Sequence, residues 1–140
     1  MAHFFIMCSK DGGNMEEEIK LAIAAKENAH STIYKVGAVL KMKSGKYYTG
    51  CNIDNQHIMS ICAERVAFSK AISEGEKDFD YIITVGSNPG SEVLDRCLPC
   101  GYCRQFMSEF VDDDFKIYTY YDGKLEKFSM KDLLPEAFKF

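Results

Sequence analysis

The sequence predicts an α/β domain with three layers, α/β/α, in which helices cover both sides of a mixed five-stranded sheet. Segments with helical spacing of apolar residues alternate with short apolar runs that are typical of strands. Two of these runs, residues 35–42 and 46–51, are separated only by a Gly-containing turn and therefore predict a hairpin. The later strands follow helices, so they need crossover connections.

The first half of the chain contributes one helix and this hairpin. We expect residues 1–14 to be an N-terminal extension and residues 15–140 to be a single domain. Asn14 can cap a helix at residues 16–28, whose first turn is rich in glutamate and so suits the positive end of the helix. The residues expected to share one face of this helix are Ile19, Ala22, Ile23 and Lys26.

The second half alternates between the two kinds of element. In chain order we expect a helix at 62–73, a strand at 81–86, a helix at 100–110, strands at 116–121 and 125–128, and a short helix at 129–134. Gly75 is placed to end the first of these helices, and Ser129 to cap the last. The run at 81–86 has no polar alternation, which predicts a strand that is buried on both faces.

Composition argues for a small-molecule partner. The 140 residues carry a net charge of -4 and show no cluster of Lys and Arg, so nucleic acid is not an expected partner. No run is long and apolar enough for a membrane helix, and the N-terminus lacks the pattern of a signal peptide. We therefore expect a cytoplasmic protein whose six cysteines are reduced, where paired cysteines more often bind metal than form disulfides.

Three of those cysteines lie in two short stretches, Cys62-Ala63-Glu64-Arg65 and Pro99-Cys100-Gly101-Tyr102-Cys103-Arg104-Gln105. Cys100 and Cys103 form a Cys-x-x-Cys pair at the start of one expected helix, and Cys62 opens another. The positive ends of both helices favour thiolates. We expect these three cysteines to hold one Zn²⁺ per chain, and three protein ligands leave the fourth position open for water, as in a catalytic site.

Two neighbours of Cys62 complete the expected chemistry. Glu64 lies two residues further along the same turn, where its carboxylate can accept a proton from the activated water and deliver it to a ring nitrogen and a departing amine. Arg65 or Arg104 can hydrogen-bond a thiolate sulfur and offset part of the negative charge, and we favour Arg65 because it follows on the same first turn.

Both stretches resemble the signature of the small, homotetrameric cytidine deaminases. The resemblance covers residues 16–138 and includes Val36-Gly37-Ala38, Thr49-Gly50-Cys51-Asn52-Ile53 and Asp132-Leu133-Leu134-Pro135. It implies a hydrolase of pyrimidine salvage that converts cytidine or deoxycytidine to uridine or deoxyuridine and releases ammonia. It also implies a homotetramer, in which the terminal Phe138 and Phe140 are candidates for a subunit interface.

The resemblance further implies how the nucleoside is held. Asn52 and Asp54 occupy the positions that contact the ribose, Tyr34 the position that packs on the nucleoside, and Ala63 the position whose backbone bonds to the base. Three features depart from the family: Asp54 replaces a Glu, Tyr102 replaces a small residue, and the segment before Cys62 is one residue shorter. Blasticidin S deaminases resemble the chain in the same zinc constellation, so this antibiotic is an alternative substrate.

Alternatives stay open from the residues alone. Cys97 continues the spacing of the Cys-x-x-Cys pair, and as a fourth ligand it would close the zinc site and make the chain a structural or redox module. Asn52 and Asp54 follow a strand, where such side chains often bond to backbone groups, and Tyr34 is by default a packing aromatic. The cysteines and histidines that we expect not to bind metal are Cys8, Cys51, His3, His30 and His57, of which His57 is placed to line the pocket.

Overall fold

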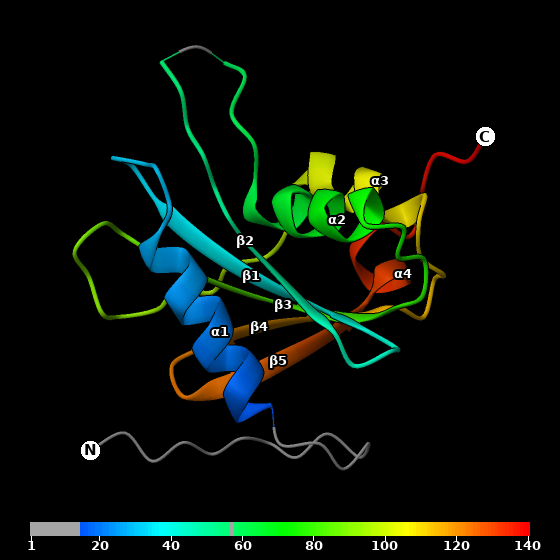
Figure 1. Ribbon diagram of the computed structural model, residues 1–140, viewed down its shortest axis with the longest axis horizontal. Helices are drawn as coiled ribbons and strands as arrows, with labels where there is room; N and C mark the ends of the chain where they lie inside the picture. Colours follow the sequence, from blue (N-terminus) through cyan, green and yellow to red (C-terminus); the bar gives the residue numbers. More distant parts are fainter. Residues whose placement is uncertain (1–14, 57) are drawn as a thin grey trace.

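A computed structural model describes residues 15–56 and 58–140, and it has the expected three-layer α/β architecture (Figure 1). In chain order the elements are α1 (Glu16–Glu27), β1 (Lys35–Met42), β2 (Tyr47–Cys51), α2 (Ala63–Ser73), β3 (Phe79–Ser87), α3 (Gly101–Ser108), β4 (Lys116–Tyr121), β5 (Lys124–Ser129) and α4 (Met130–Leu133). The expected extension at 1–14, the Asn14 cap, Cys8, His3 and His57 lie outside the described residues.

The five strands form one mixed sheet in the order β2-β1-β3-β4-β5. β3 and β4 are parallel and are joined through α3, whereas the other neighbouring strands are antiparallel. The predicted mixed five-stranded sheet and the β1–β2 hairpin are therefore confirmed. β4 and β5 form a second hairpin, whose turn residues Asp122 and Gly123 have positive φ angles of 50° and 69°, as a type I′ turn requires.

Successive side chains of the central strand β3 point to opposite faces of the sheet and pack into two separate apolar cores. Ile82 and Ile83 are both fully buried, but Ile82 joins a cluster with Phe68 of α2, and Ile83 joins a cluster with Ile19 of α1. Helices α2, α3 and α4 contribute to the first cluster and α1 to the second, so the sheet has helices on both faces (Figure 1). This arrangement confirms that β3 is buried on both sides.

Two glycines let the helices approach the sheet closely. A Cβ added to Gly50 of β2 would lie 2.2 Å from the carbonyl oxygen of Ala63, which is the first residue of α2. A Cβ added to Gly37 of β1 would lie 2.0 Å from the carbonyl oxygen of Ala22 in α1. The backbone of each helix therefore rests directly on a strand, and Gly50 sets the height of the α2 N-terminus above the sheet.

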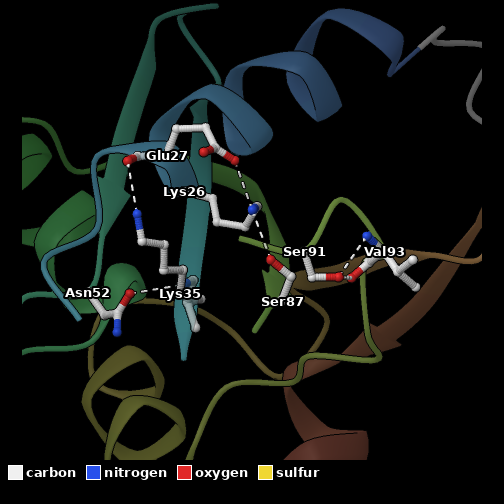
Figure 2. A network of polar contacts seen from close by, with 8 residues as sticks. Lys26, Glu27, Lys35, Asn52, Ser87, Ser91 and Val93 are labelled. Carbon is white, nitrogen blue, oxygen red and sulfur yellow. Dashed lines mark hydrogen bonds and ion pairs between the residues drawn. The ribbon is translucent and has the colours of Figure 1, made fainter. Parts of the chain in front are cut away.

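The lysine expected on the buried face of α1 is buried, and its charge is paired. Lys26 donates from Nζ to the hydroxyl of Ser87 at the end of β3 and to the carboxylate of Glu27, both at 2.9 Å (Figure 2). This contact ties α1 to the last residue of the central strand.

A few predicted boundaries are wrong by one or two residues. The first helix ends at Glu27 instead of residue 28, because the N–H of Asn28 already bonds three residues back to Ala25 in a tightened last turn. The helix after Cys100 ends at Ser108 instead of residue 110, where the N–H of Phe110 likewise bonds three residues back. Ser129 caps α4 as predicted, since its side chain accepts a hydrogen bond from the N–H of Asp132.

Candidate active site

Three sulfur atoms meet where the N-termini of α2 and α3 converge. Cys62 and Cys100 are the N-cap residues of these helices, and Cys103 lies in the first turn of α3. Their Sγ atoms lie within 4.8 Å of one another, and those of Cys62 and Cys100 are 3.7 Å apart. Two sulfurs bound at about 2.3 Å to one tetrahedral Zn²⁺ are about 3.8 Å apart, so the donor set fits this ion. Among residues 15–56 and 58–140 it is the single group with such spacing.

Both helices begin at their cysteine for local reasons. Cys62 and Cys100 have extended backbones, with ψ angles of 155° and 167°, which end the preceding segment and expose the first turn of each helix. Pro99 is buried just before Cys100, and its carbonyl oxygen accepts a hydrogen bond of 2.8 Å from Nε of Arg104. Arg104 also donates to the carbonyl oxygen of Leu133, so this arginine braces the start of α3 against α4.

The pKa values of Cys62 and Cys103 are shifted in opposite directions. A hydrogen bond with Cys103 lowers the pKa of Cys62, and Arg65 adds to this effect although burial opposes it. The same bond, together with burial, raises the pKa of Cys103. Arg65 donates from Nη2 to the sulfur of Cys62 at 3.6 Å, and its guanidinium lies over the ring of Tyr102 with 4.1 Å to the centroid. Negative charge is therefore favoured at Cys62 over Cys103, beside the guanidinium of Arg65.

A buried carboxylic acid stands next to the sulfur group. Glu64 is the second residue of α2 and is 3% exposed, and its Oε2 accepts a hydrogen bond of 3.8 Å from Sγ of Cys103. Burial raises the pKa of Glu64 to about 7, although hydrogen bonds from a backbone N–H and from Cys103 oppose this rise. A carboxyl group with a pKa near neutrality can both accept and return a proton, which suits general acid–base chemistry.

Glu64 and two of the three cysteines face a cavity of about 400 Å³. This volume is in the range of small-molecule sites. Its walls come from the start of β1, the segment after β2, the N-terminus of α2 and the connection between β3 and α3. The lining residues are Tyr34, Val36, Asn52, Asp54, Ser60, Ile61, Cys62, Ala63, Glu64, Arg96, Cys97, Leu98 and Cys100.

The four residues expected to contact substrate all line this cavity. In three of them, Asn52, Asp54 and Tyr34, the polar side-chain groups already form hydrogen bonds within the chain. The carboxamide of Asn52 accepts from the N–H of Val36 and donates to the carbonyl of Tyr34, both at 2.8 Å. Asp54 accepts a hydrogen bond from the hydroxyl of Ser31. The hydroxyl of Tyr34 donates to Asp95 at 3.3 Å.

Comparison with known proteins agrees with this geometry. The family model described as "Cytidine and deoxycytidylate deaminase zinc-binding region" matches residues 13–119. The chain belongs to this family. A cytidine deaminase of Sporosarcina psychrophila is 37% identical over 129 residues, which cover 89% of this chain and 91% of the relative. A blasticidin-S deaminase of Bacillus cereus is 34% identical over 122 residues, which cover 83% and 82%.

Solved structures of the family agree in fold. The crystal structure of a cytidine deaminase from Burkholderia pseudomallei superposes with a TM-score of 0.78 at 34% identity, over 90% of this chain and all of that one. The expected fold class, the deaminase class of enzyme and the zinc cofactor are thereby confirmed. Among the described residues, no helix has the length and apolar character that crossing a membrane would require.

Cys97 does not join the sulfur group, and several residues that line the cavity were not expected from the sequence. Cys97 is not one of the grouped sulfurs among the described residues; burial raises the pKa of its thiol to about 12, and its Sγ packs over Gly86 beside Tyr34. Sequence reasoning did not identify the other members of the cavity wall, because they share no motif or spacing. These missed residues are Val36, Ser60, Ile61, Arg96 and Leu98.

Proposed function

We propose that the chain catalyses the zinc-dependent hydrolytic deamination of cytidine and deoxycytidine, which yields uridine or deoxyuridine and ammonia. The observation that carries this proposal is the group of three sulfurs beside a buried carboxyl group at the base of a nucleoside-sized cavity. Cytidine deaminases that are 37% and 39% identical to the chain support the choice of substrate.

In this proposal Cys62, Cys100 and Cys103 hold the zinc ion. When bound there, the ion supplies Lewis-acid activation of a water molecule near neutral pH. Arg65 stabilises the thiolate of Cys62, because its guanidinium donates to that sulfur and is itself held against Tyr102. Its Nε is buried with no hydrogen-bond partner among the described residues.

Glu64 moves protons between water and substrate. It takes one proton from the water and gives it to the ring nitrogen next to the reacting carbon, as the water oxygen bonds to that carbon. The second proton of the same water then passes through Glu64 to the amine, whose C–N bond breaks so that ammonia leaves. Its buried position keeps bulk water from competing for these protons. The backbone of Ala63, at the first turn of α2, bonds to the base, and Tyr34 packs against the nucleoside.

Blasticidin S is a second candidate substrate with observations in its favour. A blasticidin-S deaminase is 34% identical over most of the chain. Asn52 and Asp54, which we expect at the ribose, are already bonded to Val36, Tyr34 and Ser31. Incubating the zinc-loaded protein with cytidine, deoxycytidine and blasticidin S, while following absorbance and ammonia release, distinguishes the substrates. Absence of turnover of both nucleosides with one zinc per chain would refute the cytidine proposal.

We further propose that the domain of residues 15–140 assembles as a homotetramer and acts in cytoplasmic pyrimidine salvage. Exposed aromatic side chains at the C-terminus support assembly, since Phe138 and Phe140 are 61% and 101% exposed. A zinc site of reduced thiols suits the cytoplasm. Light scattering after size-exclusion chromatography measures the assembly, and a monomer at micromolar concentration would contradict this part.

A further inference from the structure

One cation lines the cavity among the described residues. Arg96 lies in the connection between β3 and α3, directly before Cys97, and its side chain is 49% exposed. The lining also includes the carboxyl groups of Asp54 and Glu64. Arg96 is therefore the charged hydrogen-bond donor of this site.

Its guanidinium is held in place from the edge strand β5. Nε and Nη2 of Arg96 donate to the two carboxylate oxygens of Glu126 at 2.8 and 2.7 Å, in a paired geometry. Tyr121 donates to the same carboxylate at 2.8 Å, and Arg96 also lies over the ring of Phe128, 5.5 Å from its centroid. Such a clamp orients a long side chain before any ligand arrives, so binding costs less side-chain entropy.

The pairing with Glu126 does not use all the N–H donors of Arg96, which is itself a lining residue of the cavity. Arginine has five N–H donors, and the pairing with Glu126 occupies only Nε and one N–H of Nη2. Nη1 has no hydrogen-bond partner among residues 15–56 and 58–140. Asn52 also lines the cavity, but its carboxamide is bonded to backbone, so the unused donors of Arg96 are available for a hydroxyl-rich ligand.

The net charge of the ion pair between Arg96 and Glu126 also affects which ligands the cavity can bind. Glu126 is ionised at neutral pH, since the hydrogen bonds from Arg96 lower its pKa to about 2. The Arg96–Glu126 pair as a whole carries no net charge, and Asp54 lines the same cavity. Neutral hydroxyl groups can accept from Nη1, whereas a phosphate would meet carboxylates without a free compensating cation.

We propose that Arg96 is a specificity-determining residue that donates hydrogen bonds to the sugar oxygens of the nucleoside, and that Glu126 makes the site favour an uncharged sugar over a 5′-phosphorylated one. This inference rests on the proposed deamination of cytidine. It places sugar recognition on the β3–α3 connection and β5, in addition to the segment after β2.

Steady-state kinetics of the zinc-loaded protein test the role of Arg96. Arg96→Gln should raise the KM for cytidine about tenfold and leave kcat within about twofold, since its hydrogen bonds form equally in the ground and transition states. The dissociation constant of the product uridine, measured by calorimetry, should rise by the same factor. Lys46→Gln is the matched control, because it removes a surface cation that is also paired with a glutamate, Glu76, and does not line this cavity.

Glu126→Gln tests the charge argument and keeps Arg96. Freed from its carboxylate, the guanidinium should raise the ratio of kcat/KM for cytidine 5′-monophosphate to that for cytidine about tenfold. Melting temperature and zinc content identify any variant that fails to fold, and Arg96→Lys then replaces Arg96→Gln in the same comparison.

The outcomes separate the two proposals. If the wild-type protein turns over cytidine but Arg96→Gln matches Lys46→Gln in KM and in uridine binding, only the role of Arg96 is overturned. An unchanged nucleotide-to-nucleoside ratio in Glu126→Gln overturns the charge argument. Absence of cytidine turnover in the wild-type protein overturns the proposed function, and this inference with it.

Discussion

Substituting Gly50 by alanine should displace the zinc site. The new Cβ would lie 2.2 Å from the carbonyl oxygen of Ala63 and 2.8 Å from the amide nitrogen of Ala67. Both neighbours are backbone atoms, so no rotation of a side chain relieves the clash. Real Cβ atoms essentially never lie closer than 3.0 Å to another heavy atom of this kind. To lengthen the distance between the new Cβ and the oxygen of Ala63 to that limit, the start of α2 must move away from β2 by about 0.8 Å.

This movement carries Cys62 and Glu64 with it, because they flank Ala63 at the helix start. Ligand distances in metal sites tolerate only about 0.2 Å, and a misplacement of about 1 Å can cost about 100-fold in rate. We therefore expect Gly50→Ala to weaken zinc binding, to lower kcat/KM for cytidine about 100-fold and to destabilise the fold by about 1–3 kcal/mol.

Two further glycines provide the controls. Gly37→Ala makes a comparable clash at 2.0 Å, but with α1 on the opposite face of the sheet, so it should lower the melting temperature and spare zinc binding. Gly101→Ala lies beside Cys100 and meets nothing within 4 Å, so it should be neutral or slightly stabilising. Zinc titration, cytidine turnover and thermal melts compare all three. A Gly50→Ala protein that behaves like Gly101→Ala would refute the reasoning.

Four further predictions concern single side chains. Glu64→Gln should keep one zinc per chain and lower kcat about 100- to 10,000-fold, and normal turnover would rule out its role as the proton carrier. Phe68→Ala removes a fully buried ring that stacks on that of Phe79, so urea denaturation should show a loss of about 3–5 kcal/mol; a loss below about 1 kcal/mol would contradict this. Burial alone would raise the pKa of Glu18, but hydrogen bonds, chiefly from Tyr81, lower this pKa below 4.5. The stability that ionised Glu18 gives to the fold should therefore be fully present above pH 4.5 and be lost as the pH falls through the lowered pKa. Denaturation of Glu18→Gln and wild type at several pH values measures this, and a constant difference would disprove it. Cys97→Ser should retain its zinc, whereas zinc loss with unfolding would restore the four-cysteine alternative.

Local sequence explains the parts of the site that depend on neighbours along the chain. The spacing of Cys100 and Cys103 places both on one helical turn, and Pro99 marks where that helix begins. The unbroken apolar run at 81–86 predicts a strand buried on both sides, which is what β3 is. These features follow from periodicity and backbone preference, which act over a few residues.

Other features depend on contacts that no local pattern encodes. Asn52 is polar and follows a strand, but only the pairing of β1 with β2 brings its amide to Val36 and Tyr34. Arg96 and Glu126 are 30 residues apart and meet because β4 lies parallel to β3 and β5 folds back on β4. A bond of this kind is invisible until the order of the strands is known.

The sequence by itself therefore determined the fold class, the three thiols and the carboxylate beside them, because each is specified by residue type and short spacing. The tertiary structure decided how far apart those thiols lie and which residues line the cavity beside them. Cys62 reaches Cys100 because Gly50 lets α2 rest on β2, and the wall of the cavity is assembled from segments brought together by the sheet. Those distances arise from packing between remote segments, where steric contact and strand register, not local preference, set the geometry.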